Sequence, residues 1–201
     1  MKNALIIFAR NPELGKVKTR LAKDIGDGNA LLIYSELLSH TLTIASTINA
    51  DRFVFYADKI NDDDIWSKNV FHKKLQEGND LGERMHNSFS YLFSVGYNNV
   101  VIIGTDCPEL STGLINDSFD KLSSHNVVIG PATDGGYYLL GTDSFMPALF
   151  KNKSWSTNML LDETIETLQN EQLSYSLLTT LSDLDTFEDL KKFDSLLQLL
   201  H

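Results

Sequence analysis

The chain has 201 residues, 42% of them hydrophobic and 22% charged, and 27 acidic residues against 17 lysines and arginines give it a net charge of −10. This composition is typical of a folded globular protein and unlike that of a disordered chain. It also argues against a nucleic-acid partner, because proteins bind a phosphate backbone through clustered cations.

Cysteine content and the first apolar run restrict where the protein is expected to work. Cys107 is the only cysteine, so an intrachain disulfide and a cysteine-rich zinc site are both excluded. The apolar run 4–9 is too short for the core of a signal peptide and far too short for a membrane span. We therefore expect a cytoplasmic protein with no membrane partner.

The first half of the chain alternates apolar runs with amphipathic stretches. The runs are continuously apolar, which is typical of strands buried on both faces of a parallel sheet. Between them, apolar residues recur every three or four positions, as in helices packed against a sheet. Asp80 and Glu83 form an approximate capping box before the second helix. The predicted strands cover 4–9, 52–56 and 99–104, and the predicted helices cover 29–48 and 80–95.

The second half continues this alternation. Two strands flank a glycine-rich connection at Asp134, and Thr186 with Asp189 can cap a C-terminal helix. We find no low-complexity linker and no internal repeat, so we expect residues 1–201 to form one α/β domain with a mostly parallel central sheet. The predicted strands are 126–130, 137–141 and 175–178, and the predicted helices are 156–170 and 187–200.

The loop after the first strand carries an unusual concentration of positive charge. Ligands of such sheets bind at the carboxyl ends of the strands, and this loop gathers Arg10, Lys16, Lys18 and Arg20. Gly15 allows close approach of the backbone, and Arg20 can hold a phosphate through two hydrogen bonds. The loop indicates a site for an anion such as a nucleotide phosphate, with a solvated surface loop as the alternative. The Walker P-loop pattern is absent.

Asp106 follows the third strand and precedes a proline at position 108. A carboxylate at the ligand edge of the sheet can hold Mg²⁺ or Mn²⁺ through oxygen. A turn aspartate that bonds its own backbone is the alternative. Neighbouring Cys107 is expected to be a packed residue, because no histidine lies near it in sequence.

The segment Asp134-Gly135-Gly136 joins two predicted strands. Its glycines permit close approach of a substrate to the backbone, and Asp134 could bind sugar hydroxyls or provide a second metal ligand. Asp-Gly is also a common hairpin turn, so a structural role stays open.

Two acids, Asp183 and Asp185, precede the predicted C-terminal helix. They are expected to be helix caps or, alternatively, metal ligands. Trp155 is expected to pack in the core or to line the mouth of a pocket. The sequence shows neither the histidine spacing of a zinc hydrolase nor a serine-hydrolase motif.

Six segments, spread along the chain, carry these motifs. They are LIIFARNPELGKVKTRLA (5–22), QEGNDLGERM (76–85), VIIGTDCPELS (101–111), IGPATDGGYYLLG (129–141), WST (155–157) and DLDTFEDL (183–190). In this order they resemble the bacterial family of arsenosugar-biosynthesis-type glycosyltransferases. The resemblance spans almost the whole chain, which makes it more specific than any single motif. It implies the GT-A fold of the nucleotide-diphospho-sugar transferases, a Rossmann-like α/β sandwich.

The resemblance implies roles for individual residues. The loop after the first strand would wrap the nucleotide phosphates, Asp106 and Asp185 would hold the metal, and Asp134 would lie on the acceptor or sugar side. We expect Lys18 and Asp106 to be catalytic, with Asp134 as the base. The expected nucleotide-binding residues are Arg10, Gly15, Lys16, Lys18, Thr19, Arg20, Gln76 and Gly78. The expected substrate-binding residues are Asp134, Gly135, Gly136, Tyr137 and Trp155.

Two reactions fit this pattern. The family implies glycosyl transfer from a nucleotide-sugar to a small-molecule acceptor. However, Asp106 has no second acid at the Asp-x-Asp spacing of many GT-A glycosyltransferases, and the Lys-Thr-Arg-Leu segment at 18–21 is similar to that of 2-phospho-L-lactate guanylyltransferases. Nucleotidyl transfer from a nucleoside triphosphate to a phospho-acid or sugar phosphate is therefore the alternative. Nucleotide binding without turnover is a third possibility.

Overall fold

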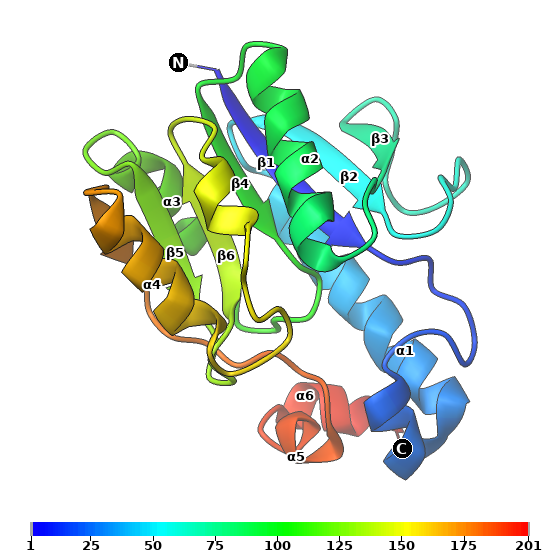
Figure 1. Ribbon diagram of the computed structural model, residues 1–201. Helices are drawn as coiled ribbons and strands as arrows, with labels where there is room; N and C mark the ends of the chain where they lie inside the picture. Colours follow the sequence, from blue (N-terminus) through cyan, green and yellow to red (C-terminus); the bar gives the residue numbers. More distant parts are fainter. Residues whose placement is uncertain (1, 201) are drawn as a thin grey trace.

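The structure, a computed structural model, describes residues 2–200, and its seven strands form one sheet (Figure 1). The strand order is β3-β2-β1-β4-β6-β5-β7. Only β6 runs antiparallel to its neighbours, β4 and β5, so the sheet is mostly parallel, as predicted. The strands are β1 Asn3–Ala9, β2 Asp51–Tyr56, β3 Phe71–Leu75, β4 Asn99–Ile103, β5 Val127–Pro131, β6 Tyr137–Thr142 and β7 Tyr175–Leu177.

Helices cover both faces of the sheet. Helices α1 and α3 pack on one face, and α2, α4 and the short η1 pack on the other (Figure 1). Within residues 2–200, no helix combines the length and apolar character needed to cross a membrane. The helices are α1 Thr19–Ser46, α2 Leu81–Ser94, α3 Thr112–Lys121, η1 Pro147–Phe150, α4 Leu160–Asn170, α5 Phe187–Leu190, α6 Asp194–Leu197 and η2 Gln198–Leu200.

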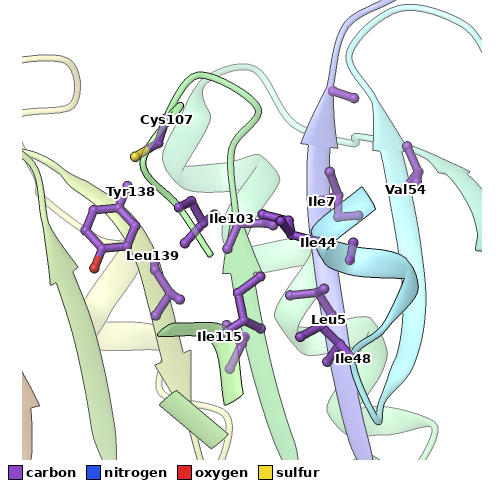
Figure 2. Close-up of a cluster of buried hydrophobic side chains, with 14 of the residues drawn as sticks. Leu5, Ile7, Ile44, Ile48, Val54, Ile103, Cys107, Ile115, Tyr138 and Leu139 are labelled. Atoms are coloured by element: carbon purple, nitrogen blue, oxygen red, sulfur yellow. The ribbon is translucent and has the colours of Figure 1, made fainter. Parts of the chain in front are cut away.

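The continuous apolar runs are explained by this sandwich. Alternate side chains of each central strand enter opposite hydrophobic layers, so every position of the strand must be apolar. Figure 2 shows part of one layer, where Leu5 and Ile7 of β1 and Ile103 of β4 lie near Ile44 of α1 and Ile115 of α3. Burial on both faces fixes β1 and β4 firmly at the centre of the sheet.

A third, smaller hydrophobic cluster lies at one end of the molecule. It joins residues of α1 to the short C-terminal helices and comprises Leu21, Ile33, Leu37, Leu184, Leu190 and Leu196. Gly26, with φ 81°, breaks the helical geometry within α1, so the first turns of α1 change direction there. Because the cluster joins Leu21, near the start of α1, to Leu184, just before α5, it holds the loop before α1 beside the segment before α5.

The structure confirms the predicted strands and corrects several boundaries. Helix α1 begins at Thr19, ten residues before the predicted start at position 29. The predicted helix 187–200 is instead α5, α6 and η2, because Phe193 adopts a non-helical φ of −123°. Strand β3 and helix α3 were not predicted: β3 is an edge strand in which only Phe71 is buried, and α3 is short and largely polar.

We expect Leu190→Ala to lower the free energy of unfolding by about 2–5 kcal/mol, because it opens a cavity in the third cluster. Leu190 is fully buried, whereas Leu199 of η2 is 40% exposed. Leu199→Ala is therefore the matched control, with an expected loss within about 0.5 kcal/mol. Urea denaturation of the two variants measures both values, and equal losses would contradict the packing role of the cluster.

Candidate functional site

The main pocket lies where the order of the strands reverses direction. From β1 the chain continues to β2 on one side, and it later returns as β4 on the other side. The carboxyl ends of β1 and β4 therefore leave a crevice between their loops, which is where open α/β sheets bind ligands. The pocket has a volume of about 690 Å³, within the usual range for small-molecule sites.

Lys18 lies at the centre of the charged part of this pocket. Its ammonium forms an ion pair with Asp106 and a second one with Asp185 at 3.1 Å, and it donates to the backbone carbonyl of Leu184 at 2.6 Å. Burial lowers the pKa of Lys18, but the charges of Asp106 and Asp185 outweigh it, so the pKa lies above its usual value. The lysine is therefore a permanent cation between two carboxylates.

Backbone bonds fix the partners of Lys18 to one another. The N–H of Leu184 donates to the carbonyl of Asp106 at 2.8 Å, while the side chain of Leu184 is buried in the third cluster. The Thr186–Asp189 capping box begins α5 directly afterwards, as predicted. The position of Asp185 relative to Asp106 is therefore set by main-chain geometry.

The loop after β1 is anchored at its first residue. The hydroxyl of Tyr34 donates to the carbonyl of Arg10 at 3.1 Å and accepts from its N–H at 3.0 Å. Within the loop, Glu13 pairs with Lys16 and Lys59, and their hydrogen bonds and charges lower the pKa of Glu13 to about 2. Lys16 is thus partly neutralised, and Arg10 and Arg20 carry most of the available positive charge of the loop.

The arginines of this acidic chain are distributed unevenly. Three of its four arginines, Arg10, Arg20 and Arg84, line the pocket. Among residues 2–200, none of them pairs with a carboxylate, although lysines and acids form ten salt bridges. Unpaired guanidinium groups around one cavity favour binding of an anion.

The opposite wall is built by the start of α2 and the segment containing Trp155. The indole of Trp155 lies against Gly82, so close that a Cβ atom at Gly82 would overlap it. Asp80 caps the helix by accepting from the N–H of Glu83 at 2.8 Å. Arg84, one turn further on, donates through Nε to the carbonyl of Gly78 at 3.1 Å. Trp155 lines the pocket while its body packs against the core, which unites the two roles expected from the sequence.

The glycine-rich turn after β5 is placed differently from the expectation. Asp134 accepts a hydrogen bond from the N–H of Gly136 at 2.9 Å and does not line the pocket. Gly135 has φ 88° and lies against the backbone of Asn158, where a side chain would clash. The structure thus gives Gly135 a packing role and Gly136 a turn hydrogen bond. Tyr137 does line the pocket, but its hydroxyl is buried with no hydrogen-bond partner among the described residues.

Asp183 is a further carboxylate that lines the pocket, in addition to Asp106 and Asp185. Burial, followed by the charges of Asp106 and Asp134, raises the pKa of Asp183 to about 7. The charge of Asp134 thus acts on Asp183 although Asp134 does not line the pocket.

Most of the predicted site residues meet in this one pocket. Arg84 and Tyr34 were not assigned to the site from the sequence; the motif that contains Arg84 gave a signal, but nothing in the sequence links Tyr34 to Arg10. Asp183 was expected to be a helix cap or, alternatively, a metal ligand. The predicted residues that line the pocket are Arg10, Lys16, Lys18, Thr19, Arg20, Gln76, Asp106, Tyr137, Trp155 and Asp185. Those outside the lining are Gly15, Gly78, Asp134, Gly135 and Gly136.

The donor set suits a magnesium or manganese ion bound together with a substrate. Asp106 and Asp185 already converge on one cation, and both present hard oxygen ligands. Within residues 2–200, no three acidic, histidine or cysteine side chains cluster closely enough to hold a metal alone. Mg²⁺ is commonly bound by one or two carboxylates, water and substrate phosphates, so two carboxylates fit this mode.

Comparisons with known proteins agree with this architecture. The family model described as "Uncharacterized protein conserved in bacteria (DUF2064)" matches residues 41–157, well over half of the chain. No curated protein sequence matches the chain.

Solved structures show the same fold. A candidate nucleotide-diphospho-sugar transferase from Desulfovibrio desulfuricans G20 has 28% identity and a TM-score of 0.86, over 100% of this chain and 99% of its own. A 4-diphosphocytidyl-2C-methyl-D-erythritol synthase from Anaerococcus prevotii has 12% identity and a TM-score of 0.60, over 98% and 96%. A CMP:2-keto-3-deoxy-manno-octonic acid synthetase complexed with CTP has 12% identity and a TM-score of 0.54, over 99% of each chain. The GT-A, Rossmann-like fold is therefore established.

We expect Gly82→Ala to displace the Trp155 indole and to destabilise the protein by about 1–3 kcal/mol, because the added methyl group has no space. Gly113→Ala in α3 is the control, since the nearest atom to its new methyl group would be Ser111 Oγ at 3.7 Å. Tryptophan fluorescence in a Trp66→Phe background reports on Trp155 alone. Unchanged emission and stability in Gly82→Ala would contradict the close contact.

Proposed function

This chain belongs to the DUF2064 family of bacterial proteins, and we propose that it is a metal-dependent, nucleotide-using transferase that moves a sugar from a nucleotide-diphospho-sugar to a small-molecule acceptor. The proposal treats residues 1–201 as one transferase domain. The observation that carries it is the pocket at the sheet's switch point, where unpaired arginines and a lysine–carboxylate cluster share one cavity.

The nucleotide is assigned to the wall formed by the loop after β1. Arg10 and Arg20 supply free guanidinium groups for the diphosphate, and Thr19 lies at the start of α1, where backbone N–H groups favour anions. Gln76 also lines the pocket, beyond the end of β3. The name of the Desulfovibrio protein and the CTP bound to the distant synthetase support a nucleotide ligand.

The metal is assigned to Asp106 and Asp185. A bound Mg²⁺ or Mn²⁺ would neutralise the charge of the departing diphosphate. The chain's own part in that step is electrostatic: the arginines of the loop oppose the negative charge that develops on the leaving group.

In this reaction, the acceptor hydroxyl oxygen forms a bond to the anomeric carbon. The bond from that carbon to the diphosphate oxygen breaks, and the nucleoside diphosphate leaves with the electron pair. The proton of the acceptor hydroxyl passes to a base, for which Asp134 stays the candidate predicted from the sequence. Trp155 and Tyr137 supply apolar surface against which a sugar ring can lie.

Nucleotidyl transfer is the second candidate function, and two observations favour it. Asp106 has no second acid at the Asp-x-Asp spacing. In addition, Arg84 offers a cation without a carboxylate partner among residues 2–200, on the wall that α2 contributes, apart from the loop after β1. An acceptor that carries a phosphate or carboxylate would suit Arg84. Its oxygen would attack the α-phosphorus of a nucleoside triphosphate, and pyrophosphate would leave.

Product analysis separates these reactions. We expect the protein, with Mg²⁺ or Mn²⁺ and a panel of nucleotide-sugars, nucleoside triphosphates and acceptors, to yield a nucleoside diphosphate and a glycosylated acceptor. Pyrophosphate with a nucleotide-linked acceptor would instead establish nucleotidyl transfer. Asp106→Asn is expected to abolish metal-dependent turnover, whereas Asp117→Asn, in a surface ion pair of α3, should not. Full activity in Asp106→Asn would remove Asp106 from the mechanism.

We expect Arg20→Ala to weaken nucleotide binding by roughly 10- to 100-fold, because it removes a charge-assisted hydrogen bond. Lys23→Ala is the control: it makes the same change of charge on an exposed side chain of α1 that does not line the pocket. Isothermal titration calorimetry measures both dissociation constants. If the two variants bind alike, Arg20 belongs to the solvated surface and not to the phosphate site.

A further inference from the structure

The place between Asp106 and Asp185 is filled by a side chain of the protein itself. The Lys18 ammonium contacts both carboxylates and the Leu184 carbonyl, and only 4% of the Lys18 side chain is exposed. The three oxygen atoms around Nζ resemble the oxygen surroundings of a bound cation. An ammonium and a divalent ion cannot both occupy the space between the same two carboxylates.

The backbone shows that Lys18 is held in this position. Its φ of 46° and ψ of 43° place it in the left-handed region, which is uncommon for residues other than glycine. As the residue before α1, Lys18 makes no side-chain cap, so its side chain is free of the usual role at a helix start. Such a conformation persists only where surrounding contacts stabilise it, and the two ion pairs are those contacts.

We propose that Lys18 is the resident counter-ion of the Asp106–Asp185 pair and excludes a divalent metal until the phosphates of a bound nucleotide draw its ammonium away. This inference rests on the proposed function for the identity of the ligand. It makes Lys18 a positioning residue that couples the two binding events: phosphates compete with the carboxylates for the ammonium, and the released carboxylates become available to the metal. Because coupling is reciprocal, the metal also strengthens nucleotide binding.

The two carboxylates do not become buried, unpaired charges when their lysine is replaced. Their side chains are 46% and 49% exposed, so water can solvate them when Lys18 is replaced. Lys18→Met keeps the length and apolar stem of the side chain and removes only its charge. The variant therefore tests the ammonium itself.

Binding of Mn²⁺ alone, followed by electron paramagnetic resonance of the free ion, tests the proposal without any nucleotide or turnover. We expect the wild-type protein to bind Mn²⁺ weakly and Lys18→Met to bind it more tightly, on the order of tenfold or more, because a neighbouring like charge has been removed. Lys23→Met controls for the change in net charge. Adding Asp106→Asn to Lys18→Met is expected to abolish the gain, which locates the ion.

Equal Mn²⁺ affinity in the wild type and Lys18→Met would overturn the proposal. A gain in Mn²⁺ affinity of the same size in Lys23→Met would also overturn it. So would a gain in Lys18→Met that persists when Asp106→Asn is added. If Lys18→Met fails to fold, thermal unfolding of the wild type still decides: strong stabilisation by Mn²⁺ alone would show that Lys18 does not exclude the ion. If the protein binds no nucleotide, the proposed function is refuted. The Mn²⁺ comparison uses no nucleotide, so it still decides whether Lys18 excludes the metal.

Discussion

The contact between the Lys18 ammonium, Asp106 and Asp185 is the interaction on which the organisation of the site depends. It joins three segments that are distant in sequence: the start of α1, the end of β4 and the segment before α5. A buried ammonium is costly unless it is paired and hydrogen-bonded. The loops around it are therefore held in the arrangement that supplies those partners, and this arrangement also shapes the pocket.

Two parts of the fold support this contact. The central strands, buried on both faces, fix where the loop after β1 and Asp106 leave the sheet. The third cluster docks the C-terminal helices onto α1 and brings Leu184 and Asp185 to the same place. The pocket thus lies between the carboxyl end of the sheet and a small separate core, so packing changes in that core are expected to change the arrangement of the pocket residues.

The distribution of charge explains how an acidic chain can bind an anion. Most lysines pair with the excess acids on the surface, whereas the arginines at the pocket have no carboxylate partner in the part of the chain that the structure describes. Carboxylates line the same cavity, next to Lys18. A ligand that brings phosphates together with a divalent cation complements both parts, and this is the chemical form in which nucleotides are commonly bound.

The sequence by itself determined the class of fold, most strands, and the segments that form the site, because continuous apolar runs and local charge reversal are properties of short stretches of chain. Through the resemblance it assigned Asp106 and Asp185 to one metal site and Lys18 to the nucleotide phosphates. Only the tertiary structure decided that Lys18 pairs with both carboxylates, that Tyr34 anchors Arg10, and that Asp134 caps a turn outside the pocket lining. Edge strand β3 and the broken C-terminal helix also escaped prediction. The physical reason is common to these cases: pairing, burial and the competition for a hydrogen bond depend on residues far away in the chain, which local patterns do not contain.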